Sequence, residues 1–440
     1  MNKMVILLIP VVLASSVQIE RDTLDNGLIV LTVEAHKIPV VEMKTHVRAG
    51  SIFDPAGKEG LANLVGQMLI RGTERSTYDE IVESIESVGG LLTPFASEDY
   101  SGLSGKVLSK DLPLLIDMMS ECLMHPQFDS LELSRLKRET ISVIRARSDD
   151  PFEVSERGFR DLIFGNHPLG HFPTGFDSSV SVLSRTDVEW FYDAYYHPNN
   201  TFLVCVGDFS KDSLMMLLNE GFGGWARSEI PDTVLAEPIA SDRPVARIIP
   251  MDISQAYILL GNFGPKYGAD DWHAARVMNY ILGGAGLTSR ISYSIREKKG
   301  LAYIAYSYFQ RFENGGYFVA EVQTKKDMVN EAVVSLLDEI RSMREGIRVD
   351  ELEWAKKFYT GYLPLSYDTY SEMVNIVAQI EIAGYSLDYL DQFENYISAL
   401  TMEDLIAAAR SHLHPDRFYL LIVGNIEPED VKVEGIEWME

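Results

Sequence analysis

The sequence predicts an α+β fold built from two homologous domains, each a mixed or antiparallel sheet covered by helices. The first observation is length: 440 residues exceed one ordinary hydrophobic core, and two domains of about 200 residues each are the natural division. The second is composition, because 46% hydrophobic residues is typical of a globular chain. The third is an internal repeat, in which hairpin, helices and apolar strand follow one another twice.

The repeat is clearest where each half ends. Residues Tyr196–Asp208 read YHPNNTFLVCVGD and Leu413–Asn425 read LHPDRFYLLIVGN, with His-Pro and Gly in the same register. An amphipathic helix pattern precedes each segment, over Thr186–Tyr195 and over Met402–His412. We therefore expect both halves to end with a helix followed by a buried strand.

Alternating apolar and polar residues predict a pair of strands in each half. The first pair is Leu91–Ser97 with Ser101–Leu108, and the second is Ala302–Arg311 with Gly316–Gln323. Pro94 lies inside the first of these strands, and proline is confined to edge strands because it lacks an N–H donor.

The join between the halves is rich in proline and has few periodic apolar residues. We expect domains at 17–228 and 245–440, connected by a linker at 229–244. Residues 1–16 have the pattern of an export signal: a lysine, an apolar run and small residues before a cleavage site. This predicts localisation in a bacterial periplasm, and no other stretch is apolar enough to span a membrane.

Charge and cysteine content narrow the function classes. A formal net charge of −26 disfavours nucleic acid and anionic lipid surfaces as partners, because both require clustered Lys and Arg. This negative charge suits a protein that is not stably inserted in a membrane. If its ligands are charged peptides, we expect them to be basic. The two cysteines, Cys122 and Cys205, follow apolar patterns and are expected to be buried free thiols.

A helical segment in the first half carries a specific resemblance. Residues Gly60–Thr73 read GLANLVGQMLIRGT, which resembles the signature helix of the insulinase/pitrilysin zinc peptidases, G-x-x-H-x-x-E-H-x-x-x-x-G-T. In that family two histidines bind zinc and the glutamate acts as general base. Here Asn63 and Gln67 stand at the histidine positions and Gly66 stands at the glutamate position.

These replacements remove the chemistry of the motif. Amides are poor zinc ligands, and glycine has no side chain to accept a proton. The family's third ligand is expected near 144–146 of the helix Leu131–Arg147, where no carboxylate occurs, and Glu139 matches a supporting glutamate at best. The resemblance therefore implies that this chain binds no metal and does not hydrolyse peptides alone.

A second block, in the other half, retains the family pattern. Residues Leu282–Arg290 read LGGAGLTSR and Ile295–Tyr303 read IREKKGLAY. In active members, an arginine and a tyrosine of this block reach a zinc site on another half or subunit and hold the substrate and its oxyanion. By register these correspond to Arg296 and Tyr303. The glycine loop consists of Gly283, Gly284 and Gly286.

Two alternatives to this assignment remain open in the sequence. Arg290 is the rival for the functional arginine, although its register matches a structural position. Arg296 could instead pair with a surface carboxylate, and Tyr303 could be an ordinary strand aromatic.

The resemblance implies a non-catalytic subunit of a heterodimeric zinc endopeptidase. The partner would be a homologous H-x-x-E-H subunit that carries the zinc, and the substrates would be peptides. The alternatives are an inactive scaffold and a peptide-binding homodimer of the same fold.

Overall fold

A computed structural model describes residues 17–233 and 235–439. The predicted export signal at 1–16 lies outside these described residues. The first half of the chain contains a six-stranded sheet in the order β1-β2-β6-β3-β5-β4. Its strands are β1 (Glu20–Thr23), β2 (Ile29–Glu34), β3 (Val40–Val47), β4 (Leu91–Ala96), β5 (Ser101–Leu108) and β6 (Thr201–Gly207).

The second half contains another six-stranded sheet, in the order β12-β7-β11-β8-β10-β9. Its strands are β7 (Val245–Pro250), β8 (Gln255–Phe263), β9 (Ala302–Phe312), β10 (Gly315–Lys325), β11 (Tyr419–Gly424) and β12 (Glu437–Met439).

The two sheets share one topology. Five strands correspond, in the order β2-β6-β3-β5-β4 in the first sheet and β7-β11-β8-β10-β9 in the second. In each sheet the first two of these strands pair in parallel, β2 with β6 and β7 with β11. The remaining shared pairings are antiparallel, which makes both sheets mixed. This confirms the predicted α+β repeat and both predicted strand pairs. Strand β4, which contains Pro94, is an edge strand as expected, and β9 is the corresponding edge of the second sheet.

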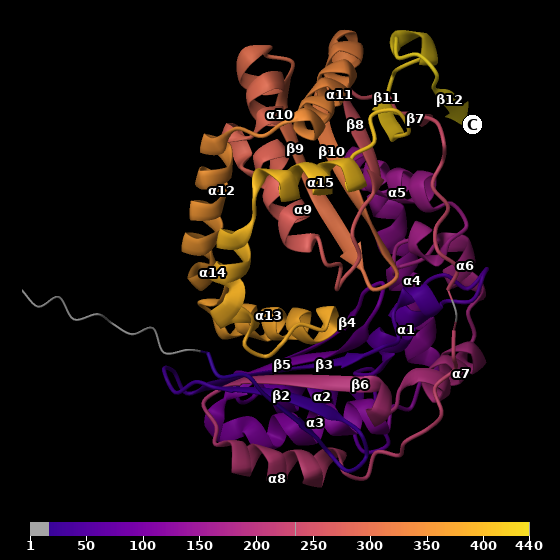
Figure 1. Ribbon diagram of the computed structural model, residues 1–440. Coiled ribbons are helices and arrows are strands. Elements are labelled where there is room, and N and C mark those ends of the chain that lie inside the picture. The colour runs from indigo at the N-terminus through magenta and orange to yellow at the C-terminus, as the bar shows by residue number, and fades with distance from the viewer. Residues whose placement is uncertain (1–16, 234, 440) are drawn as a thin grey trace, which may run out of the picture.

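Helices cover both faces of each sheet (Figure 1). Those of the first half are α1 (Leu61–Met68), α2 (Tyr78–Glu86), α3 (Leu112–Met124), α4 (Ser130–Arg147), α5 (Pro151–Phe164), α6 (Asp177–Val182), α7 (Arg185–Tyr195) and α8 (Lys211–Phe222). Those of the second half are α9 (Trp272–Asn279), α10 (Arg290–Ser292), α11 (Val329–Glu345), α12 (Val349–Tyr362), α13 (Tyr370–Ala383), α14 (Tyr389–Ala399) and α15 (Met402–His412). The helices predicted before each final strand are α7 and α15.

The two halves exchange one helix each. Helix α5, from the first half, packs on β8 and β11 of the second sheet. Helix α13, from the second half, packs on β3 and β6 of the first sheet. Figure 1 shows α13 against the first sheet, on the side opposite α3 and α8. Each half therefore completes the core of the other, and the contact between them is a packed apolar interior.

A polar contact also joins the halves at the turn between β9 and β10. Glu313 accepts from Arg48 and from the Tyr100 hydroxyl, while its own backbone N–H donates to the Asp99 carboxylate at 3.2 Å. Asp99 is only 6% exposed. Burial, and then the charge of Glu313, raise the pKa of Asp99 from its ordinary 3.8 to about 7.

This raised pKa predicts a pH-dependent stability. Because the folded-state pKa of Asp99 lies above its unfolded value, its contribution is fully present below about pH 4 and is lost as pH rises through about 7. Relative to the Asp99→Asn variant, the wild type should lose up to about 1.4 kcal/mol of unfolding free energy per pH unit in that window. Urea unfolding of both proteins between pH 5 and pH 8 measures the difference. A constant difference across this range would contradict the assignment.

Candidate functional site

Helix α1 carries the residues that stand at the zinc-motif positions. Its apolar side, which includes Leu64 and Val65, is fully buried. Asn63 and Gln67 lie one helical turn apart and are half-buried. Neither side chain makes a hydrogen bond to any other residue that the structure describes. The structure thus places the two amides on one helix face, as the motif requires of its ligands.

Gly66 marks a close approach between α1 and the edge strand β4. A Cβ atom at this position would lie 3.1 Å from the carbonyl oxygen of Phe95 and 3.6 Å from the Ala96 Cβ. That separation is tighter than most real Cβ contacts. A longer side chain would therefore require β4 to shift, so the loss of the general base is accompanied by close packing of the helix on the strand.

The positions expected for a third ligand serve other purposes. Ile144 is buried in the core, and Arg145 forms an ion pair with Asp177 at 2.7 Å. Glu139 pairs with Arg71 at 2.8 Å. Over residues 17–233 and 235–439, no group of three or more His, Cys, Asp or Glu side chains could hold a metal ion. The residues present do not fit the zinc ion that the motif would bind.

The Arg/Tyr block forms a compact exposed site. Arg296 lies in a π-helical turn, Tyr293–Lys298, and Tyr303 lies near the start of β9. Gly300, with φ of +63°, provides the left-handed turn that brings the two together. The Arg296 guanidinium lies over the Tyr303 ring, 4.5 Å from its centroid. Tyr303 is 75% exposed, so its hydroxyl is accessible to a ligand.

The two candidate arginines differ in how their donors are used. Arg290 binds both carboxylate oxygens of Glu351, at 2.8 and 2.6 Å, and also donates to the Gly346 carbonyl. Its side chain is 12% exposed. Arg296 has one ion-pair contact, to the neighbouring Glu297 at 3.5 Å. Because Arg290 is committed to a buried ion pair, the geometry favours Arg296 as the arginine that is free to bind a ligand.

The glycine loop fixes the position of this block against β9. A Cβ atom on Gly283 would lie 2.1 Å from the Ser307 hydroxyl and 2.5 Å from its backbone nitrogen. Gly286 adopts a left-handed conformation, with φ of +58°. Asn279 then bonds to Ser307 through both its amide atoms. Gly283 therefore allows the helix to approach the strand, and Gly284 lies against Asn279 in the same turn.

Exposed apolar side chains lie in and beside the Arg/Tyr block. Leu287 belongs to its first segment and Tyr293 lies between the two segments, and they are 55% and 60% exposed. The adjacent α12 carries exposed aromatic side chains, of which Phe358 stacks on Tyr280 at 4.3 Å. Exposed aromatic surface of this kind is typical of protein–protein interfaces.

Three histidines outside the zinc-motif positions have structural partners. His167 and His171 bond to backbone carbonyls, while His412 bonds to Asp271 at 2.7 Å. Cys122 and Cys205 are buried free thiols, as predicted.

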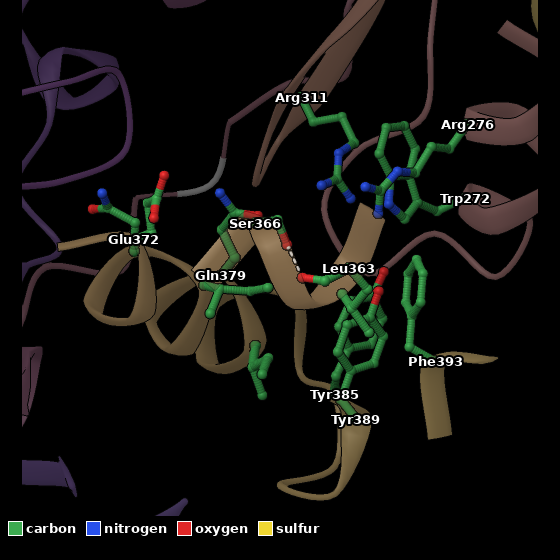
Figure 2. A pocket seen from close by; sticks show the side chains of 13 residues that line it. Trp272, Arg276, Arg311, Leu363, Ser366, Glu372, Gln379, Tyr385, Tyr389 and Phe393 are labelled. Atoms are coloured by element: carbon green, nitrogen blue, oxygen red, sulfur yellow. Dashed lines mark hydrogen bonds between the residues drawn. The ribbon is translucent and has the colours of Figure 1, made fainter. Parts of the chain in front are cut away.

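The sequence did not indicate one further group, a pair of arginines in a pocket between α9, β9 and α13. Arg276 and Arg311 line this pocket of about 230 Å³ (Figure 2). No local motif connects them, since they belong to different elements and only the fold brings them together.

Comparisons with known proteins agree with the fold. Residues 29–170 match the model of insulinase (peptidase family M16), and residues 183–359 match the peptidase M16 inactive domain. The uncharacterized zinc protease YmxG of Bacillus subtilis is 25% identical over 92% of this chain and 98% of its own length. No helix in the described part of the chain has the length and hydrophobicity to cross a lipid bilayer.

Solved structures share the whole architecture. A peptidase M16 inactive domain from Pseudomonas fluorescens superposes with a TM-score of 0.83 and 24% identity, over 96% of this chain and all of that one. The periplasmic protease PqqL of Escherichia coli superposes with a TM-score of 0.79 and 17% identity, over 95% of this chain and 49% of that one. With family models matching both halves, and the model of the inactive domain matching the second, the chain belongs to the insulinase family of peptidases, M16.

Proposed function

We propose that this chain is the non-catalytic subunit of a two-chain zinc endopeptidase. Its Arg296 and Tyr303 would enter the H-x-x-E-H zinc site of a homologous partner, hold the substrate backbone and stabilise the oxyanion. The zinc and the general base would both come from the partner. The observation that carries this proposal is the exposed, stacked Arg296–Tyr303 pair on a chain whose own zinc positions are Asn63, Gly66 and Gln67.

Chemistry supports the role of this pair. Hydrolysis of a peptide bond places negative charge on the carbonyl oxygen, and fixed donors at that position stabilise the transition state. A phenol that is 75% exposed, with a guanidinium stacked on its ring, offers such donors outside this chain. The surrounding exposed apolar surface supports docking of a second subunit there.

Length and location support the same proposal. The chain matches 49% of PqqL, so a second chain of this size would complete an assembly of comparable extent. That relative is described as periplasmic, and residues 1–16 here have the pattern of an export signal. We therefore place the assembly in the periplasm, with peptides as substrates; the net charge of −26 favours basic ones.

The test is reconstitution. The mature chain and an H-x-x-E-H homologue from the same genome would be purified separately and mixed, with quenched fluorescent peptides as substrates. We expect zinc-dependent cleavage from the mixture and from neither chain alone, together with a heterodimer on size-exclusion chromatography. Full activity of the homologue by itself would reduce this chain to a scaffold, and a homodimer that binds peptides without cleavage would support the peptide-binding alternative.

A further inference from the structure

The pocket between α9, β9 and α13 contains two cations without an anion. Neither Arg276 nor Arg311 has a carboxylate within ion-pair distance among the residues that the structure describes. The chain carries 65 Asp and Glu but only 39 Lys and Arg, so carboxylates are available for most of its cations. Two arginines without an ion-pair partner in the described part of the chain therefore lie in one pocket, although carboxylates are abundant in the sequence.

Two buried polar groups of this pocket interact with each other. The Nη1 atom of Arg311 and the hydroxyl of Tyr385 are both inaccessible to solvent, and the two side chains interact electrostatically. Burial lowers the pKa of Arg311, as expected for a guanidinium removed from water. Neither the Arg311 nor the Arg276 guanidinium donates to a carboxylate within residues 17–233 and 235–439, so their remaining N–H groups are the donors available to a ligand in the pocket.

Aromatic rings hold both guanidinium groups by their faces. Arg311 lies 3.6 Å from the centroid of the Trp272 ring, and Arg276 lies 4.5 Å from that of Tyr359. Stacking occupies the face of a guanidinium and leaves the N–H groups in its plane free to donate. Figure 2 shows the two groups converging beside Trp272, one from β9 and the other from α9. This arrangement suits a planar anion bound by forked hydrogen bonds.

The described titratable groups in and beside this pocket form no ion pair with the two arginines. Glu372 lines the far end of the pocket, where its carboxylate accepts from the backbone and hydroxyl of Thr369 at 3.0 and 2.8 Å. His273, which stacks with Tyr389, is neutral, because burial and then the charges of Arg276 and Arg311 lower its pKa to about 4.

The pocket continues toward the edge of the first sheet. Arg311, Asn375 and Gln379 line both this pocket and a second cavity of about 380 Å³. Phe95 and Ser97, at the end of β4, line that second cavity. An extended peptide whose carboxylate lies between the arginines would therefore continue past β4, which is an edge strand.

We infer that Arg276 and Arg311 form a binding site for a peptide carboxylate, either a free C-terminus or an acidic side chain. The site selects an anion although the chain as a whole is strongly acidic. The peptide nature of the ligand rests on the proposed function, whereas the binding of a carboxylate rests only on the two arginines and on their lack of an ion-pair partner among the described residues.

The test uses the isolated mature chain and isothermal titration calorimetry, so it requires neither a partner nor activity. Three short acetylated peptides serve as probes: one with a free C-terminal carboxylate, its C-terminal amide, and that amide with one internal Glu. We expect the free acid, the Glu peptide or both to bind roughly 10- to 100-fold more tightly than the plain amide. The comparison between the two acidic peptides distinguishes a C-terminus from a side chain.

Variants localise the binding. Arg276→Met and Arg311→Met should each reduce affinity for the preferred acidic peptide by about 10-fold or more. The matched control is Arg341→Met, which removes a surface arginine paired with Asp338.

Equal binding of the acid and amide peptides by the wild-type chain would overturn the inference, whatever the variants show. Binding of inorganic phosphate with no binding of peptides would overturn the peptide assignment. Acid-selective binding by a chain that adds no activity to its partner would refute the proposed function and leave this site standing.

Discussion

Replacing Arg296 by alanine, or Tyr303 by phenylalanine, should lower kcat/KM of the assembled two-chain peptidase on the order of 100-fold. Each change removes a donor that we place near the oxyanion, in a site where water is excluded and fixed donors have large effects. The measurement is steady-state cleavage of a quenched peptide by the reconstituted complex at matched subunit concentrations.

The contact between the Arg296 and Tyr303 side chains leads to a prediction for the double variant. Since the guanidinium lies 4.5 Å from the centre of the phenol ring, each residue helps to position the other. The double variant should therefore lose less activity than the product of the two single losses. Tyr293→Phe is the control, because Tyr293 is a 60% exposed tyrosine in the same helical turn. Wild-type kcat/KM in both single variants would leave the pair without a catalytic contribution.

The second large effect concerns stability and follows from the exchange of helices. Phe159 of α5 is 1% exposed and packs edge-on against Tyr317 of the second sheet, with ring centroids 5.7 Å apart. Phe159→Ala should lower the free energy of unfolding by about 3–5 kcal/mol, because it leaves a cavity between the halves. Urea unfolding monitored by circular dichroism measures the change.

The same variant tests whether the halves unfold together. Because α5 and α13 each complete the core of the opposite half, we expect one cooperative transition for the wild type and for Phe159→Ala. Phe152→Ala is the matched control, since Phe152 is on the same helix but 39% exposed, and its effect should stay within about 0.5 kcal/mol. Two separate transitions, of which only one responds to Phe159→Ala, would show that the halves are independent.

Features with a local signature in the sequence were predictable. Alternation with a period of two located both strand pairs, and the His-Pro and Gly register located α7 with β6 and α15 with β11. The prediction that each half ends with this strand was wrong, because α8 follows β6 and β12 follows β11. The replaced zinc-motif positions and the Arg/Tyr block were also identified by register. Arg296 and Tyr303 are close in sequence, and one turn at Gly300 brings them into contact. In these cases the interacting residues belong to one or two neighbouring elements.

The sequence by itself therefore determined that this chain has two repeated halves, and it predicts a zinc motif with Asn63, Gly66 and Gln67 in place of the family's residues and an Arg/Tyr block in the second half. Only the tertiary structure decided that α5 and α13 exchange sheets, and that Arg290 is held by Glu351. It alone also revealed the pocket formed by Arg276 and Arg311. The physical reason is that periodicity reports whether a side chain is buried, whereas the partner that satisfies its packing or charge is set by contacts between distant parts of the chain.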